Sequence, residues 1–108
     1  ILNNTYISHT NGNFSTALEA DGDNGNPTIN NFTAITTDPG TALQFKKMSG
    51  ATMTNVLLSG YDVNVDMKDD GPLANIIVDG TPLTSEDDNV FNGTAVDISG
   101  WAWIMSRL

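Results

Sequence analysis

Apolar positions recur along this chain in a pattern that repeats several times. Four segments align without gaps, at residues 1–8, 28–35, 52–59 and 72–79, and each has an apolar residue, any residue, an asparagine and a mostly apolar stretch. The apolar residues are Leu2, Ile29, Met53 and Leu73, and the asparagines are Asn4, Asn31, Asn55 and Asn75. The asparagines are 27, 24 and 20 residues apart. A variable period of this size is typical of solenoids, whose turns differ in length while their strands stay in register.

Short alternating segments between the asparagines predict a second strand in each repeat. They lie at residues 17–19, 43–45 and 63–67, and their alternation is typical of half-buried strands. Each is followed by a corner containing Gly22, Gly50 or Gly71, where we expect glycine to supply a positive φ. Stacking of such repeats by parallel pairing, about 4.8 Å apart, predicts an all-β fold. We therefore predict a parallel β-helix, or β-solenoid, of about four coils.

The repeated asparagines have a physical role in such a stack. At a corner the backbone leaves the sheet and its polar groups lose their strand partners. A column of side-chain amides can bond to these groups and to the amides of the coils above and below. We predict that Asn4, Asn31, Asn55 and Asn75 form a structural asparagine ladder on the inner side of the corner.

The last part of the chain does not follow the repeat. We assign residues 1–80 to the coils, and residues 81–108 to an acidic loop and a C-terminal cap of the same domain. The end of the chain contains both tryptophans, Trp101 and Trp103. Solenoids need an atypical terminal segment to cover their last coil, so we predict that these tryptophans form the cap. The first coil, which contains Leu2, has no such cover in the sequence.

Composition narrows the choice of partners. The 108 residues include 4 Lys and Arg against 13 Asp and Glu, for a net charge of -9, and no cysteine. Such an acidic surface repels nucleic acid and anionic membranes. The apolar runs are far shorter than the roughly 20 residues that a membrane-spanning helix needs. We expect neither a nucleic-acid partner nor a membrane span.

Two stretches give the chain a family resemblance. Residues 19–22 with 26–35 (EADG and NPTINNFTAI), and residues 97–103 (DISGWAW), resemble the C-terminal part of large secreted or lipid-anchored right-handed parallel β-helix proteins of marine Gram-negative bacteria. The resemblance implies a right-handed β-helix, an extracellular or cell-surface location, and a chain that is one part of a longer protein. It implies no catalytic residues.

One acidic corner is a candidate metal site. Asp21, Asp23, Asn24 and Asn26 lie within six residues and offer the oxygen ligands that Ca²⁺ prefers. Their spacing departs from that of an EF-hand loop, because Gly25 stands where an oxygen ligand is needed. The alternative is a solvated turn rich in Asx residues. We expect no required cofactor, with Ca²⁺ as the candidate ligand of this corner.

Two classes of function remain open at this point. The first is a structural or adhesive surface module without catalytic activity, which self-associates through its uncapped first coil as a filament or a homodimer, or joins the rest of a longer β-helix. The second is a β-helix that binds or degrades polysaccharide, because enzymes of that kind resemble this architecture. The sequence shows no catalytic set of residues, so we favour the first class.

Overall fold

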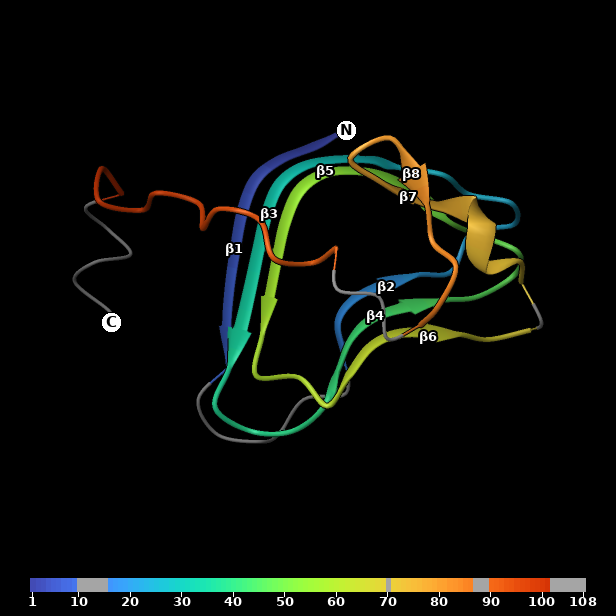
Figure 1. The fold of residues 1–108 in the computed structure, drawn as a ribbon, viewed down its shortest axis with the longest axis horizontal. Coiled ribbons are helices and arrows are strands. Elements are labelled where there is room, and N and C mark those ends of the chain that lie inside the picture. The colour runs from blue at the N-terminus through green and yellow to red at the C-terminus, as the bar shows by residue number, and fades with distance from the viewer. Residues whose placement is uncertain (10–15, 70, 87–89, 102–108) are drawn as a thin grey trace.

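The computed structural model describes residues 1–9, 16–69, 71–86 and 90–101, and is mostly β-structure (Figure 1). One sheet has five strands in the order β1-β3-β5-β7-β8, and the other has three in the order β2-β4-β6. The first sheet comprises β1 (Leu2–His9), β3 (Thr28–Thr36), β5 (Ala51–Ser59), β7 (Ile76–Val78) and β8 (Thr81–Pro82). The second comprises β2 (Thr16–Ala20), β4 (Thr41–Phe45) and β6 (Val63–Met67). All neighbours pair in parallel except β7 and β8, which are antiparallel.

The chain alternates between the two sheets, and like residues align from one passage to the next. Leu2 pairs with Ile29, Ile29 with Met53, and Met53 with Val78. Leu43 of the second sheet lies between Leu18 and Val65 in the same way. The buried side chains of both sheets form one apolar cluster, because each strand turns its apolar residues toward the other sheet. The predicted parallel strands and their register are confirmed for the first three repeats.

The corner within each long strand is made by asparagine. Asn4, Asn31 and Asn55 have φ values of 55°, 58° and 55°, in the left-handed region that asparagine tolerates better than most residues. Figure 1 shows β1, β3 and β5 bending together at this corner. The bend changes which residues face inward, so Ile29 and Phe32 are both buried although they are three positions apart.

Glycine does not make the corners that follow the second strands, contrary to our expectation. Gly22, Gly50 and Gly71 have no positive φ, and residues such as Lys47 and Asp69 adopt it instead, at 54° and 57°. Gly50 is required for another reason. A Cβ at this position would lie 2.3 Å from the Asn75 carbonyl oxygen, so the close approach of the Asn75 backbone leaves no room for a side chain.

The fourth repeat has a different register from the one predicted. Residues 72–79 do not align with 52–59 in order, because Leu73–Asn75 form a 3-10 turn (η1) and Thr52 pairs with Ile77. Asn75 therefore does not belong to the asparagine ladder, and its side chain donates to the Met48 carbonyl at 3.1 Å. Counted on from the Met53–Val78 pair, the residue level with Asn55 is Gly80, which has a φ of 84°.

The apolar interior after the last repeat is covered by residues that the sequence did not single out. Leu83 and Phe91 are 3% and 4% exposed and join the core cluster. Their backbone groups bond to Ile76 and Leu58 respectively. Trp101, which we predicted as part of the cap, is half-buried and lines a groove over the asparagine corner on the outside of the sheet, and its capping role stays a prediction. Trp103 lies outside the described residues.

Candidate functional site: the asparagine ladder and the two ends of the stack

Side-chain amides connect successive strands at the asparagine corner. The Asn31 amide nitrogen donates to the Asn4 side-chain oxygen at 3.0 Å, and the Asn55 amide nitrogen donates to the Asn31 oxygen at 3.2 Å. A second, shorter ladder runs beside it, where Asn30 donates to Asn3 at 3.0 Å. The ladder is thus present for Asn4, Asn31 and Asn55. All of these bonds point the same way, since each amide donates to the strand that precedes it in the chain order of the sheet.

The ladder lies on the outer side of the corner, where we had placed it on the inner side. Asn4 and Asn31 are exposed and Asn55 is half-buried. The left-handed φ at each of these positions turns the side chain away from the core while the apolar neighbours continue inward. The amides therefore face solvent and the C-terminal segment of the chain.

The C-terminal segment crosses the ladder and bonds to it. Thr94 donates its N–H to the Asn55 side-chain oxygen at 2.8 Å and accepts from the Asn55 amide nitrogen at 3.1 Å. Val96 donates its N–H to the hydroxyl of Thr33, which is completely buried, at 2.8 Å. Figure 1 shows this segment running across β5, β3 and β1. The N–H and carbonyl groups of Thr94 thus bond to the Asn55 amide in place of the asparagine that a further repeat would supply.

We call the outer edges of β1 and β2 the front edge, since these are the end strands of the two sheets. Its apolar side chains are less covered than those in register behind them. Leu2 is 39% exposed, whereas Ile29 and Met53 in the same row are at most 1% exposed. Ile7 and Leu18 are only partly buried. The eight residues of β1 include no Asp, Glu, Lys or Arg. Among the described residues, no strand pairs with the outer side of β1, which is uncharged, whereas β2 carries Glu19, paired with Lys46.

The opposite end of the larger sheet, which we call the back end, is closed by the chain itself. The first half of β5 pairs with β7, and β7 in turn pairs with β8. The second half of β5 is covered by the segment around Phe91. Leu58 donates to the Phe91 carbonyl at 3.0 Å, and Gly93 donates to the Val56 carbonyl at 2.9 Å. Between these halves, the Asn55 N–H is satisfied by the Asp79 carboxylate at 2.9 Å.

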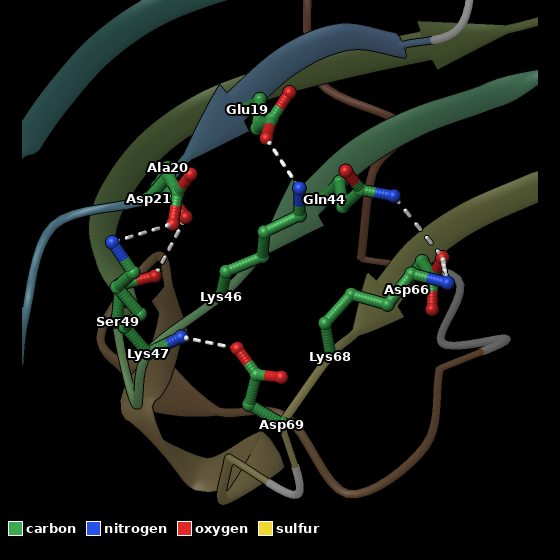
Figure 2. A network of polar contacts seen from close by, with 10 residues as sticks. All are labelled: Glu19, Ala20, Asp21, Gln44, Lys46, Lys47, Ser49, Asp66, Lys68 and Asp69. Carbon is green, nitrogen blue, oxygen red and sulfur yellow. Dashed lines mark hydrogen bonds and ion pairs between the residues drawn. The ribbon is translucent and has the colours of Figure 1, made fainter.

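Acidic and basic side chains form ion pairs at the smaller sheet, both between strands and within one strand segment (Figure 2). Lys46 pairs with Glu19 at 2.9 Å, and this bond raises the pKa of Lys46. Lys68 pairs with Asp66 at 3.1 Å. Exposed pairs of this kind contribute little stability, commonly below about 1 kcal/mol. Their main effect is on charge, because the described lysines are neutralised locally and the remaining surface is strongly acidic.

The predicted calcium residues do not gather into a carboxylate cluster. The Asp21 carboxylate lies 3.7 Å from the Lys47 ammonium group, the Asn24 N–H donates to the Lys47 carbonyl, and the Asn26 oxygen accepts from the Thr52 hydroxyl at 3.5 Å. Asp23 is exposed. Among the described residues, no three His, Cys, Asp or Glu side chains stand close enough together to hold a metal ion. Calcium binding stays a prediction, which thermal melts with calcium and with EDTA would check.

A groove lies between the ladder and the C-terminal segment. Its volume is about 380 Å³, and it is lined by Asn4, Asn31, Asn55, residues 95–97 and Trp101. Sequence reasoning identified the asparagines and Trp101 but did not bring them together. The residue that connects them, Thr94, carried no signal, because it contributes backbone groups rather than a characteristic side chain.

The chain was compared with known proteins in three ways. No protein-family model, no curated protein and no solved structure matches it. Within the part of the chain that the structure describes, no helix is both long enough and apolar enough to cross a membrane.

Proposed function

We propose that this chain is an extracellular structural or adhesive module without catalytic activity, built as a right-handed parallel β-helix of about four coils. The two parallel sheets, the aligned apolar rows and the asparagine ladder support the β-helix assignment. The resemblance of residues 19–22, 26–35 and 97–103 to secreted β-helix proteins supports the handedness and the location. In this proposal the module works by stacking its front edge on a second copy of itself.

The open front edge is the observation that carries the proposal. Soluble proteins protect exposed strand edges with charged residues, proline or a covering segment. β1 is eight residues long, has no such charge or proline, and leaves Leu2 39% exposed, whereas the residues in register behind it are buried. Burying this edge against another coil would remove apolar surface from water at roughly 25 cal/mol per Å² and satisfy its backbone groups.

A closed dimer fits these surfaces better than a filament does. A head-to-tail filament needs a receptive back end on every copy. At that end the edge of β5 is already paired with β7 and with the segment around Phe91, and Asn55 is bonded to Thr94. Two front edges are both open, and β1 carries no formal charge to repel its counterpart despite the net charge of -9. We therefore expect two copies to meet front to front.

Two matched substitutions test this interface. Leu2→Lys places a charge in the front edge, and Val63→Lys places one on β6, a strand of the smaller sheet that lies away from the front edge. The two side chains are 39% and 37% exposed, so both replacements should be tolerated by the folded monomer. Sedimentation and mass photometry over a range of concentrations should show a dimer for the wild type and for Val63→Lys, and a monomer for Leu2→Lys.

Three results would contradict the proposal. A wild-type monomer at every concentration would show that the front edge is not an interface. Species that keep growing with concentration would show an open assembly instead of a closed dimer. Sustained release of reducing ends or unsaturated sugars from polysaccharide by the purified protein would show an enzyme, the second class of function that the sequence left open.

A further inference from the structure

The groove over the asparagine ladder combines exposed amides, an indole and a carboxylate. Its walls are the corner of the larger sheet on one side and residues 95–97 with Trp101 on the other. The position of the second wall is fixed by the bonds from Thr94 to Asn55 and from Val96 to Thr33. The groove is therefore held by backbone hydrogen bonds at two points, although its lining is open to solvent.

The amides that line the groove have donors and lone pairs that the ladder does not use, and the amides nearest the front edge have the most. A side-chain amide has two N–H donors and an oxygen with two lone pairs. Asn55 uses both donors, on Asn31 and Thr94, and Asn31 uses one donor and one lone pair within the ladder. Within the described part of the chain, the Asn4 side chain accepts one bond, from Asn31, and its amide nitrogen donates none. Asn4 and Asn31 thus offer donors and acceptors in a row.

The row has a regular spacing. Successive coils lie about 4.8 Å apart, which is the separation of strands in a sheet. This is close to the length of one pyranose ring in an extended glycan, so neighbouring amides can reach hydroxyl groups of the same chain of sugars. A ligand with paired donors and acceptors on each unit suits this row better than a ligand with a single polar group.

Trp101 and Asp97 add the other two features of a sugar site. An indole offers a flat apolar face, against which the C–H face of a pyranose ring can pack while its hydroxyls remain free to bond. The Asp97 carboxylate accepts from the Ser99 N–H at 2.9 Å, and hydrogen bonds from Ser99 lower the pKa of Asp97. The carboxylate is therefore charged at neutral pH and accepts hydroxyl hydrogen bonds.

We propose that this groove binds a neutral saccharide, with its hydroxyls on Asn4 and Asn31 and one ring against Trp101. Anionic glycans are disfavoured, because the groove contains a carboxylate and the protein has a net charge of -9. The volume of about 380 Å³ falls within the range of small-molecule sites and suits one or two sugar units. Asn4 lies on β1, so this end of the groove adjoins the front-edge interface, and binding is best measured on the Leu2→Lys variant that is expected to be monomeric.

A matched pair of variants tests the site. Asn4→Asp and Asn3→Asp each keep the oxygen that accepts from the next coil, in the main ladder and in the second ladder respectively. Both positions are exposed and both variants add one negative charge. Only Asn4 lines the groove, so only Asn4→Asp removes amide donors from the saccharide. Trp101→Ala removes the indole face.

Calorimetry and chemical-shift titration with cellohexaose, xylohexaose and laminarihexaose should show saturable binding of at least one of them to the wild type. Asn4→Asp should weaken it about tenfold, the effect of losing one or two neutral hydrogen bonds, and Asn3→Asp less than about twofold. Trp101→Ala should weaken it by at least as much as Asn4→Asp, with an unchanged circular dichroism spectrum.

Other results would overturn the proposal. Binding of none of the three oligosaccharides would remove it, and equal losses for Asn3→Asp and Asn4→Asp would place the binding elsewhere. Polygalacturonate binding as tightly as the neutral saccharides would show that the groove does not select by charge. Each of these readouts can be made with Leu2→Lys, the variant expected to be monomeric, so a failure here is separate from a failure of the dimer.

Discussion

The front edge and the back end of this protein are built from the same kind of strand, but they differ in how far the rest of the chain covers them. At the front, the outer side of β1 meets no other described strand, and Leu2 at the start of its apolar row is 39% exposed. At the back, Val78 ends the same row at 1% exposure, covered by the chain that returns over it. Among the described strands, the larger sheet is therefore closed by the chain at its back end and not at its front edge.

The difference shows what closes such a stack. The back end is not sealed by another coil of the repeat. It is sealed by short irregular pieces, namely the β8 strand, two buried side chains at Leu83 and Phe91, and the Thr94 backbone bonded to Asn55. Each piece satisfies one type of exposed group: strand backbone, apolar interior or ladder amide.

The largest expected difference between the two ends is in apolar burial. Phe91→Ala should lower the free energy of unfolding by about 3 to 5 kcal/mol, because it leaves a cavity at a side chain that is 4% exposed. Leu2→Ala should cost less than about 1 kcal/mol, since much of that side chain is already in water. Urea unfolding of both variants, at concentrations where the protein is monomeric, measures the two values. Equal costs would mean that Phe91 does not close the back end.

The second expected effect tests how closely the C-terminal segment lies on the ladder. A Cβ at Gly93 would lie 2.5 Å from the Asn55 side-chain oxygen and 3.0 Å from the Val56 backbone, whereas a Cβ at Gly100 would meet no atom of the described residues within 4 Å. Gly93→Ala should push the segment away and cost roughly 2 kcal/mol, within the range for overpacking. Gly100→Ala should change stability by less than about 0.5 kcal/mol. Thermal melts of the two variants would decide, and similar midpoints would argue against this docking.

The smallest expected difference in stability is between asparagine substitutions at the two ends of the ladder. Asn55→Gly and Asn4→Gly both keep a backbone that accepts a positive φ, so the comparison isolates the side-chain amide. Asn55→Gly removes three ladder and segment bonds and should cost about 1 to 3 kcal/mol. Asn4→Gly removes one exposed bond and should cost less than about 1 kcal/mol. Denaturant unfolding gives both values, and a larger loss for Asn4 would reverse our view of which end is fixed.

Sequence reasoning succeeded where a residue type and its spacing had one physical explanation. The alternating segments predicted β2, β4 and β6, and the x-apolar-x-Asn pattern predicted the register of β1, β3 and β5. It failed in the fourth repeat, where Leu73 and Asn75 fit the pattern by letter but lie in a 3-10 turn. The pattern has only two fixed positions, so it could not show that Met53 pairs with Val78, five residues after the predicted partner Leu73.

The sequence by itself determined the stacking of strands, because apolar rows and corner asparagines are properties of residue type and period. Only the tertiary structure decided how the stack ends and which surface is left open. Phe91, Gly93 and Thr94 come together with Val56 and Asn55 across more than thirty intervening residues, through backbone bonds and close contacts that residue type does not encode. The same folding back places Trp101 beside the ladder, and so creates the groove that no local pattern predicted.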